Sequence, residues 1–142
     1  MRKFLMILSA VVFAGHANAA EPVIYSYEGS FDDATFSVED AIVSKGLVID
    51  YVSHVGDMLN RTGADIGATK EIFKAADIFL FCSAVVSRKV MEANPLNLTY
   101  CPYSIFVFED EDGVKIGHDR YPEGEMQEVQ KLLDGIVKSA IE

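Results

Sequence analysis

The sequence predicts a two-layer α+β domain, in which helices pack on one face of a largely antiparallel sheet. Strand-like segments follow one another, and a short turn joins the last two of them as a hairpin. The longest amphipathic helical patterns lie towards the two ends of the chain. The length of 142 residues suits a single domain, which we place at residues 21–142 after a leader segment.

The first strand and the first helix follow from clear local patterns. Residues 23–28 alternate apolar and polar side chains, which is the period of a strand. Ser30 and Asp33 have the spacing of a capping box, and apolar residues then recur on one helical face until Gly46. We therefore expect a helix over residues 31–45.

The middle of the chain predicts two further strands. Residues 47–55 are rich in Val, Ile and Tyr, which favours a strand. In residues 57–76, glycines separate stretches that each have room for only a turn or two of helix. Residues 78–82 are apolar at every position, as in a central strand that is covered on both sides.

The last third of the chain predicts a short helix, a hairpin and a final helix. The short helix is expected at residues 84–93, and the hairpin joins strands 103–109 and 114–120 through the acidic turn 110–113. In the final helix, apolar residues keep a helical spacing at Met126, Val129, Leu133, Ile136, Val137 and Ala140.

Residues 1–20 have the three parts of an export signal. Arg2 and Lys3 are basic, residues 4–14 are apolar, and residues 17–19 form the small-x-small pattern of a cleavage site. The apolar stretch is shorter than the roughly 20 residues that span a bilayer. We therefore expect a periplasmic or secreted protein, with no membrane insertion after the signal is cleaved.

The charge of the remaining chain limits the classes of molecule that it can bind. The leader contains two of the 12 basic residues and no acidic one, so the rest carries 10 basic and 22 acidic residues, a net charge of −12. Nucleic acids and anionic lipids are themselves negative, so this acidic protein should repel them.

Both faces of the predicted sheet are apolar. Alternation within each strand separates the phenylalanines from their aliphatic neighbours, and for adjacent strands we expect Phe79, Phe81, Phe106 and Phe108 on one face and Leu80, Ile105 and Val107 on the other. We expect one face to meet the helices. The other should meet a second copy of the chain, which predicts a homodimer, or else line a ligand cavity.

Cys82 and Cys101 are the strongest candidates for a binding or chemically reactive site. Their sulfurs lie at the same end of the sheet if the two adjoining strands are antiparallel neighbours, and at opposite ends if the strands are parallel. An exported disulfide closing this loop would contribute roughly 3 kcal/mol. The other interpretations are a redox-active or soft-ligand-binding thiol pair, and two unrelated buried thiols.

Other site patterns are weaker. His54 and His118 are conceivable partners of the cysteines in a zinc or copper site, but all four residues lie on separate elements. We therefore expect no metal or cofactor, and two partly exposed strand histidines. Residues 108–119 match a calcium loop only in part and suit a hairpin better. No known catalytic motif occurs, so nothing supports enzyme activity and no catalytic residue is predicted.

Several features together resemble a known bacterial family. They are a strand ending in Cys82, a short helix, Asn94-Pro95, Tyr100-Cys101-Pro102, the apolar strand 105–109, the helix start 30–33 and the helix exit 45–47. This combination resembles the domain of unknown function 302. The resemblance implies a compact α+β domain similar to the sheet-and-helix arrangement of TATA-binding protein. It also implies antiparallel cysteine strands, a dimer, and no established activity.

Together these observations predict a non-catalytic homodimer outside the cytoplasm. It would bind a small ligand or an envelope protein near the end of the sheet that holds Cys82 and Cys101. The alternative is a thiol-dependent redox protein, or a soft-metal protein that binds copper or zinc, using the same two sulfurs.

Overall fold

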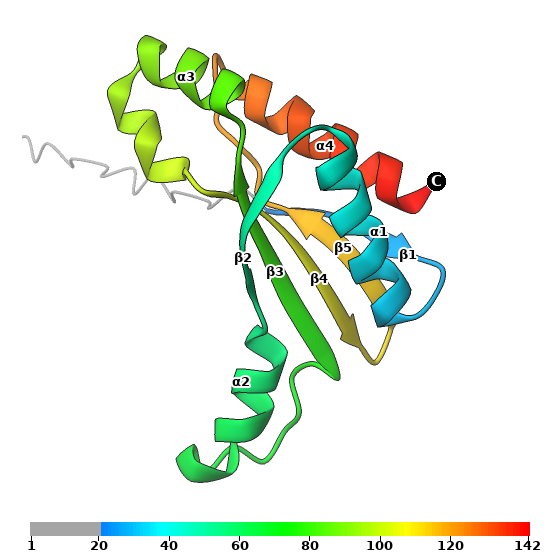
Figure 1. Ribbon diagram of the computed structural model, residues 1–142. Helices are drawn as coiled ribbons and strands as arrows, with labels where there is room; N and C mark the ends of the chain where they lie inside the picture. The colour runs from blue at the N-terminus through cyan, green and yellow to red at the C-terminus, as the bar shows by residue number, and fades with distance from the viewer. Residues whose placement is uncertain (1–20) are drawn as a thin grey trace, which may run out of the picture.

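The structure is a computed structural model that describes residues 21–142, so the expected export signal lies outside the described residues. Its centre is a five-stranded sheet with the order β1-β5-β4-β3-β2, in which every neighbouring pair is antiparallel (Figure 1). The strands are β1 (Val23–Tyr27), β2 (Val48–Ser53), β3 (Ala75–Cys82), β4 (Tyr103–Asp110) and β5 (Gly113–His118). The predicted α+β fold with an antiparallel sheet is confirmed.

Two long helices form the second layer. Helices α1 (Phe31–Ser44) and α4 (Gln127–Ile141) pack against each other on one face of the sheet (Figure 1). Shorter helical segments lie beyond its ends, and they are α2 (Val55–Thr62), η1 (Ala64–Ile66), α3 (Ala84–Ala93) and η2 (Pro95–Tyr100). Within residues 21–142, no helix has the length and apolarity required to span a membrane.

Local sequence signals determine where several elements begin and end. The capping box of α1 forms as predicted, because the Ser30 hydroxyl accepts from the Asp33 amide and the Asp33 carboxylate accepts from Ser30. The acidic turn joins β4 to β5 as a hairpin, with Asp110 paired to Gly113. This hairpin confirms the reading of residues 108–119 as strand and turn.

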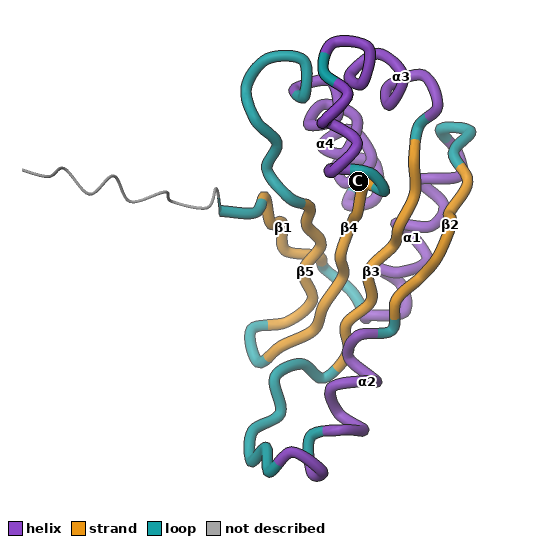
Figure 2. The backbone as a smooth tube through the Cα atoms, turned by 90° about the vertical axis from the view of Figure 1, so that its left-hand side faces the viewer, coloured by secondary structure: helices purple, strands orange, loops and turns teal. Residues whose placement is uncertain are grey.

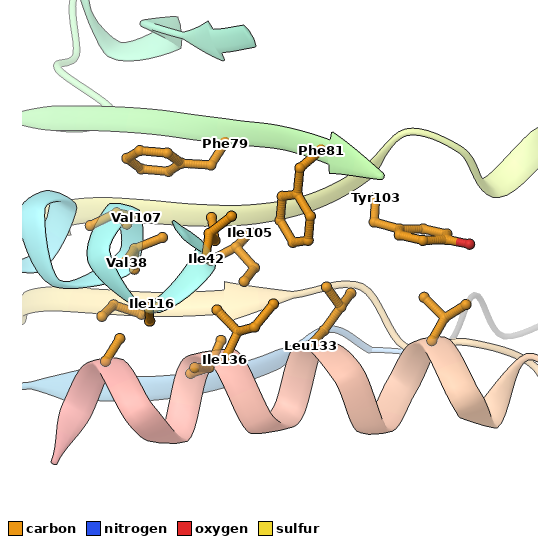
Figure 3. Packing of buried hydrophobic residues seen from close by; sticks show 14 of the residues in the cluster. Val38, Ile42, Phe79, Phe81, Tyr103, Ile105, Val107, Ile116, Leu133 and Ile136 are labelled. Carbon is orange, nitrogen blue, oxygen red and sulfur yellow. The ribbon is translucent and has the colours of Figure 1, made fainter. Parts of the chain in front are cut away.

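The core lies between the sheet and the two long helices. Figure 3 shows Phe79, Phe81, Ile105, Val107 and Ile116 pointing from the strands towards α1 and α4. Helix residues of the predicted apolar stripes complete this cluster, among them Val38, Ile42, Leu133 and Ile136, all fully buried. Burial of this apolar surface is the main stabilising term for a domain of this size.

The four phenylalanines of β3 and β4 do not share one face, which corrects our expectation. Partners across an antiparallel ladder point to the same side, and Phe79 pairs with Ile105 rather than with Phe106. Phe79 and Phe81 therefore face the helices, whereas Phe106 and Phe108 lie on the opposite face. The parity count failed because the register depends on how the connection between the strands is folded.

The face opposite the helices is apolar and carries no helix over its centre, as Figure 2 shows from that side. We call it the open face. Its residues on the three central strands include Ala76, Ile78, Leu80, Ser104, Phe106, Phe108, Lys115 and Gly117. Phe106 lies over Gly117, where an added Cβ would come within 2.6 Å of its ring. Both faces of the sheet are thus apolar, as expected.

Candidate functional site

Three separate stretches of chain meet at one end of the sheet. Because β3 and β4 are antiparallel, the end of β3 at Cys82 lies near the start of β4. A disulfide joins Cys82 to Cys101, whose Cα atoms are 6.6 Å apart. β5 runs antiparallel to β4 and also ends here, at His118. We call this region the disulfide end of the sheet.

The disulfide closes the segment that contains α3 and η2. This segment is held at further points, since Ser83 caps α3 by accepting from the Val86 amide. The hydroxyls of Ser87 and Tyr103 lie 3.0 Å apart and connect α3 to β4. The covalent link and these hydrogen bonds together fix α3 at the disulfide end.

The two histidines do not behave as we expected. His118 is fully buried, and its Nδ1 lies 2.7 Å from the carbonyl of Asp119 while its Nε2 lies 2.9 Å from the Asp134 carboxylate. His54 follows β2, where it is largely exposed and pairs with Asp77. The expectation of two partly exposed strand histidines is therefore wrong for His118, because its inward position on β5 places the ring in the core.

The partners of His118 define its hydrogen-bonding state. A carbonyl only accepts hydrogen bonds, so Nδ1 must donate to Asp119. The second hydrogen bond joins Nε2 of His118 to Oδ1 of Asp134. Both nitrogens of the buried ring are therefore hydrogen-bonded.

Cys82, Cys101, His54 and His118 do not come together as a zinc or copper site. The sulfurs are bonded to each other, and each histidine pairs with a different aspartate. Within the part of the chain that the structure describes, no group of three or more His, Cys, Asp and Glu side chains is placed to hold a metal ion.

Side chains of α4 hold the chain that leaves β5. The Tyr121 amide donates to the buried Oε1 of Gln130 at 2.9 Å, and Gln127 Nε2 donates to the carbonyls of Tyr121 and Pro122. The Nε2 of Gln130 in turn donates to Asp134, the partner of His118. We call these contacts the α4 clamp. They fix residues 119–121, which would otherwise be a mobile loop after a strand.

Residues 119–121 line a pocket beside the disulfide. Its volume is about 300 Å³, and its lining residues are Thr99, Tyr100, Pro102, Ser104, Asp119, Arg120 and Tyr121. Tyr100 and Pro102 are the two chain neighbours of Cys101, and Ser104 lies on the open face. This volume is at the lower end of the range for small-molecule sites, about 300–1,000 Å³.

Three tyrosines pack together at the disulfide end, and Tyr100 and Tyr121 among them line the pocket. The Tyr121 ring lies 5.9 Å from the Tyr100 ring and 6.1 Å from the Tyr103 ring, centre to centre. Burial raises the pKa of Tyr121 far above its usual range, with smaller contributions from Asp119 and Tyr103. The Tyr121 hydroxyl therefore keeps its proton at any physiological pH and can donate a hydrogen bond.

Sequence reasoning found the cysteines but not the pocket residues Asp119, Arg120 and Tyr121. The sequence did contain a signal for the α4 clamp. Gln130 stands at an inward position of the apolar stripe of α4, and His118 continues the inward parity of β5. A polar residue at such a position indicates a buried hydrogen bond.

Replacing Gln130 by Leu should destabilise the protein. Leu fits a similar volume but removes the acceptor of the Tyr121 amide, which leaves a buried donor unsatisfied at a cost of about 1–3 kcal/mol. The free energy of unfolding in urea measures the effect. The matched control Lys131→Leu changes the exposed neighbouring position and should alter stability by less than about 0.5 kcal/mol. Equal effects of the two substitutions would contradict the α4 clamp.

Comparison with known proteins identifies the family. The family model described as domain of unknown function DUF302 matches residues 23–139. No curated protein matches the chain. The crystal structure of an uncharacterized conserved DUF302 protein from Bacillus stearothermophilus has a similar fold, with a TM-score of 0.68 and 14% sequence identity over 84% of this chain and 97% of that one. Since the family model spans nearly the whole described domain, the chain belongs to the DUF302 family.

Proposed function

We propose that this protein is an exported, non-catalytic homodimer that binds a small polar molecule in the pocket at the disulfide end of the sheet. The observation that carries the proposal is the α4 clamp. Two side chains of α4, the half-buried Gln127 and the buried Gln130, hold Tyr121 by its carbonyl and its amide, and residues 119–121 line the pocket. Fixing a loop in this way prepares it for binding, because the ordering entropy is lost before the ligand arrives.

The expected location outside the cytoplasm agrees with the disulfide. Bonds such as Cys82–Cys101 form and persist mainly in oxidising compartments. The basic, apolar and small-residue parts of residues 1–20 support the same proposal. A small ligand that enters the periplasm would thus reach the pocket directly.

The open face supports the homodimer. On the three central strands its charged residues are Lys115 and Asp110, which form an ion pair with each other at the hairpin. The rest of the chain is strongly acidic, so two copies repel each other wherever carboxylates meet. The open face is apolar and brings no unpaired carboxylate from its central strands, which makes it the face best suited to a second copy.

A second candidate function, thiol redox chemistry, is favoured by the position of Cys82. This residue directly precedes Ser83, the N-cap of α3, and a helix N-terminus favours the negative charge of a thiolate. Two molecules of glutathione would reduce the bond, giving two protein thiols and one glutathione disulfide. The two sulfurs could then bind copper or zinc.

The ligand proposal predicts a localised response in NMR spectra of the mature protein. Libraries of amino acids, organic acids, amines and sugars are added to the ¹⁵N-labelled protein. One class should shift the amide signals of Tyr100 and residues 119–121, and Tyr121→Phe should weaken this response, whereas Tyr25→Phe, on β1 and outside the pocket lining, should not. If no class shifts these signals, the pocket is not a small-molecule site.

The dimer proposal predicts a change of mass on substitution at the open face. Ile24 pairs with Gly117 and Tyr51 pairs with Leu80, so both side chains lie on the open face, and both are exposed in the single chain. The mature protein should sediment as a dimer, and Ile24→Glu combined with Tyr51→Glu should yield a folded monomer, because the new charges would be buried between copies. Phe36→Glu on α1, which is 71% exposed, is the control and should remain dimeric. A wild-type monomer at every concentration would rule out the dimer.

Counting free thiols distinguishes a redox-active disulfide from a structural one. Alkylation and mass spectrometry are performed before and after incubation with a glutathione buffer poised at the potential of the cytosol. A structural bond should yield no alkylated cysteine, because structural disulfides resist the glutathione pool. Two alkylated cysteines, reversed by glutathione disulfide, would instead favour the redox function.

A further inference from the structure

The pocket contains two opposite charges that are not paired with any other residue that the structure describes. Asp119 and Arg120 both line it, yet neither takes part in an ion pair within residues 21–142. The Nε of Arg120 donates to the carbonyl of Glu21 at 3.1 Å, which orients the guanidinium group. Its two terminal nitrogens are left for a ligand, and such a planar pair suits a carboxylate.

The carboxylate of Asp119 offers the complementary interaction. The backbone of this residue is fixed, because its carbonyl accepts from His118, so the side chain starts from a defined position. An ionised carboxylate accepts hydrogen bonds only, which suits an ammonium group. Asp119 and Arg120 are neighbours on a fixed segment. The pocket therefore places a negatively charged group that can bind a cation beside a positively charged group that can bind an anion.

The hydroxyl of Tyr121 adds to this site. Tyr121 is only 6% exposed, and its hydroxyl has no hydrogen-bond partner among the described residues. No fully buried side-chain oxygen or nitrogen in the described part of the chain lacks a partner, so this hydroxyl is accessible to solvent, and its residue lines the pocket. It can donate to a ligand oxygen, since the raised pKa keeps it protonated. The more exposed Tyr100 ring beside it offers an apolar contact.

We propose that the pocket binds a free α-amino acid, with the ligand carboxylate on Arg120 and the ligand ammonium on Asp119. This inference rests on the proposed function and specifies its ligand class. A simple anion would leave Asp119 as an adjacent like charge, and a simple cation would leave Arg120 in the same position. A zwitterion satisfies both residues. It also has no net charge, so the acidity of the protein does not repel it.

The test is a calorimetric and NMR titration of the mature wild-type protein with each of the common amino acids. The best binder is then compared with its N-acetyl derivative, which lacks the ammonium group, and with its amide, which lacks the carboxylate. Each derivative should bind about tenfold more weakly or worse, because one charge-assisted hydrogen bond is lost.

Variants assign each end of the ligand to its residue. With Arg120→Gln the preference for the amino acid over its amide should vanish, while the preference over the N-acetyl derivative persists. Asp119→Asn should give the reverse pattern. Lys138→Gln, at an exposed position in the last turn of α4, is the matched control and should leave all three affinities unchanged.

Each other outcome is decisive. If no amino acid binds but another class shifts the signals of residues 119–121, this inference is wrong and the proposed function stands. The same conclusion follows if the derivatives bind as well as the parent amino acid. If neither amino acids nor any other class shifts these signals, both the inference and the proposed function fall.

Discussion

The buried hydrogen bonds between α4 and the chain after β5 are the interaction on which the disulfide end of the sheet depends. β5 ends with an inward-facing His118, and without partners this ring would be an unsatisfied polar group in the core. Asp134 and the Asp119 carbonyl provide those partners, and Gln130 extends the network to Tyr121. The direction of the chain beyond the sheet is therefore set by hydrogen-bond satisfaction, and the pocket lies where that chain passes the disulfide.

The sheet divides the molecule into a face covered by helices and the open face (Figure 2). Helices α1 and α4 cover the first, where most of the large apolar side chains are fully buried (Figure 3). The open face keeps Phe106, Phe108 and aliphatic neighbours only partly covered. The pocket joins the two faces, because Ser104 belongs to the open face while Tyr121 packs on Tyr103 of the core. A ligand at the disulfide end would thus lie near the surface we assign to the second copy.

Much of the fold could be predicted because its signals are local. The capping box at Ser30, the acidic hairpin and the stripe of α4 each depend on residues a few positions apart. The pairing of Phe79 with Ile105 could not be predicted from parity, since the segment between β3 and β4 contains two helical segments, α3 and η2, whose geometry sets the register. For residues 57–76 the sequence predicts no bounded helix, because Gly56, Gly63 and Gly67 separate short stretches, whereas the structure has α2 and η1 in this region.

Of the residues at the candidate site, the sequence predicts only Cys82 and Cys101. Asp119 and Arg120 are ordinary charged residues in the sequence, and only the α4 clamp gives them fixed positions in a pocket. The most direct measurement of this account is the native-state hydrogen exchange of the Tyr121 amide. It should exchange as slowly as the amides of β4, because its bond to the buried Gln130 opens only with global unfolding. Exchange as fast as that of the exposed residues 123–125 would show that the segment is not held, and would contradict the account.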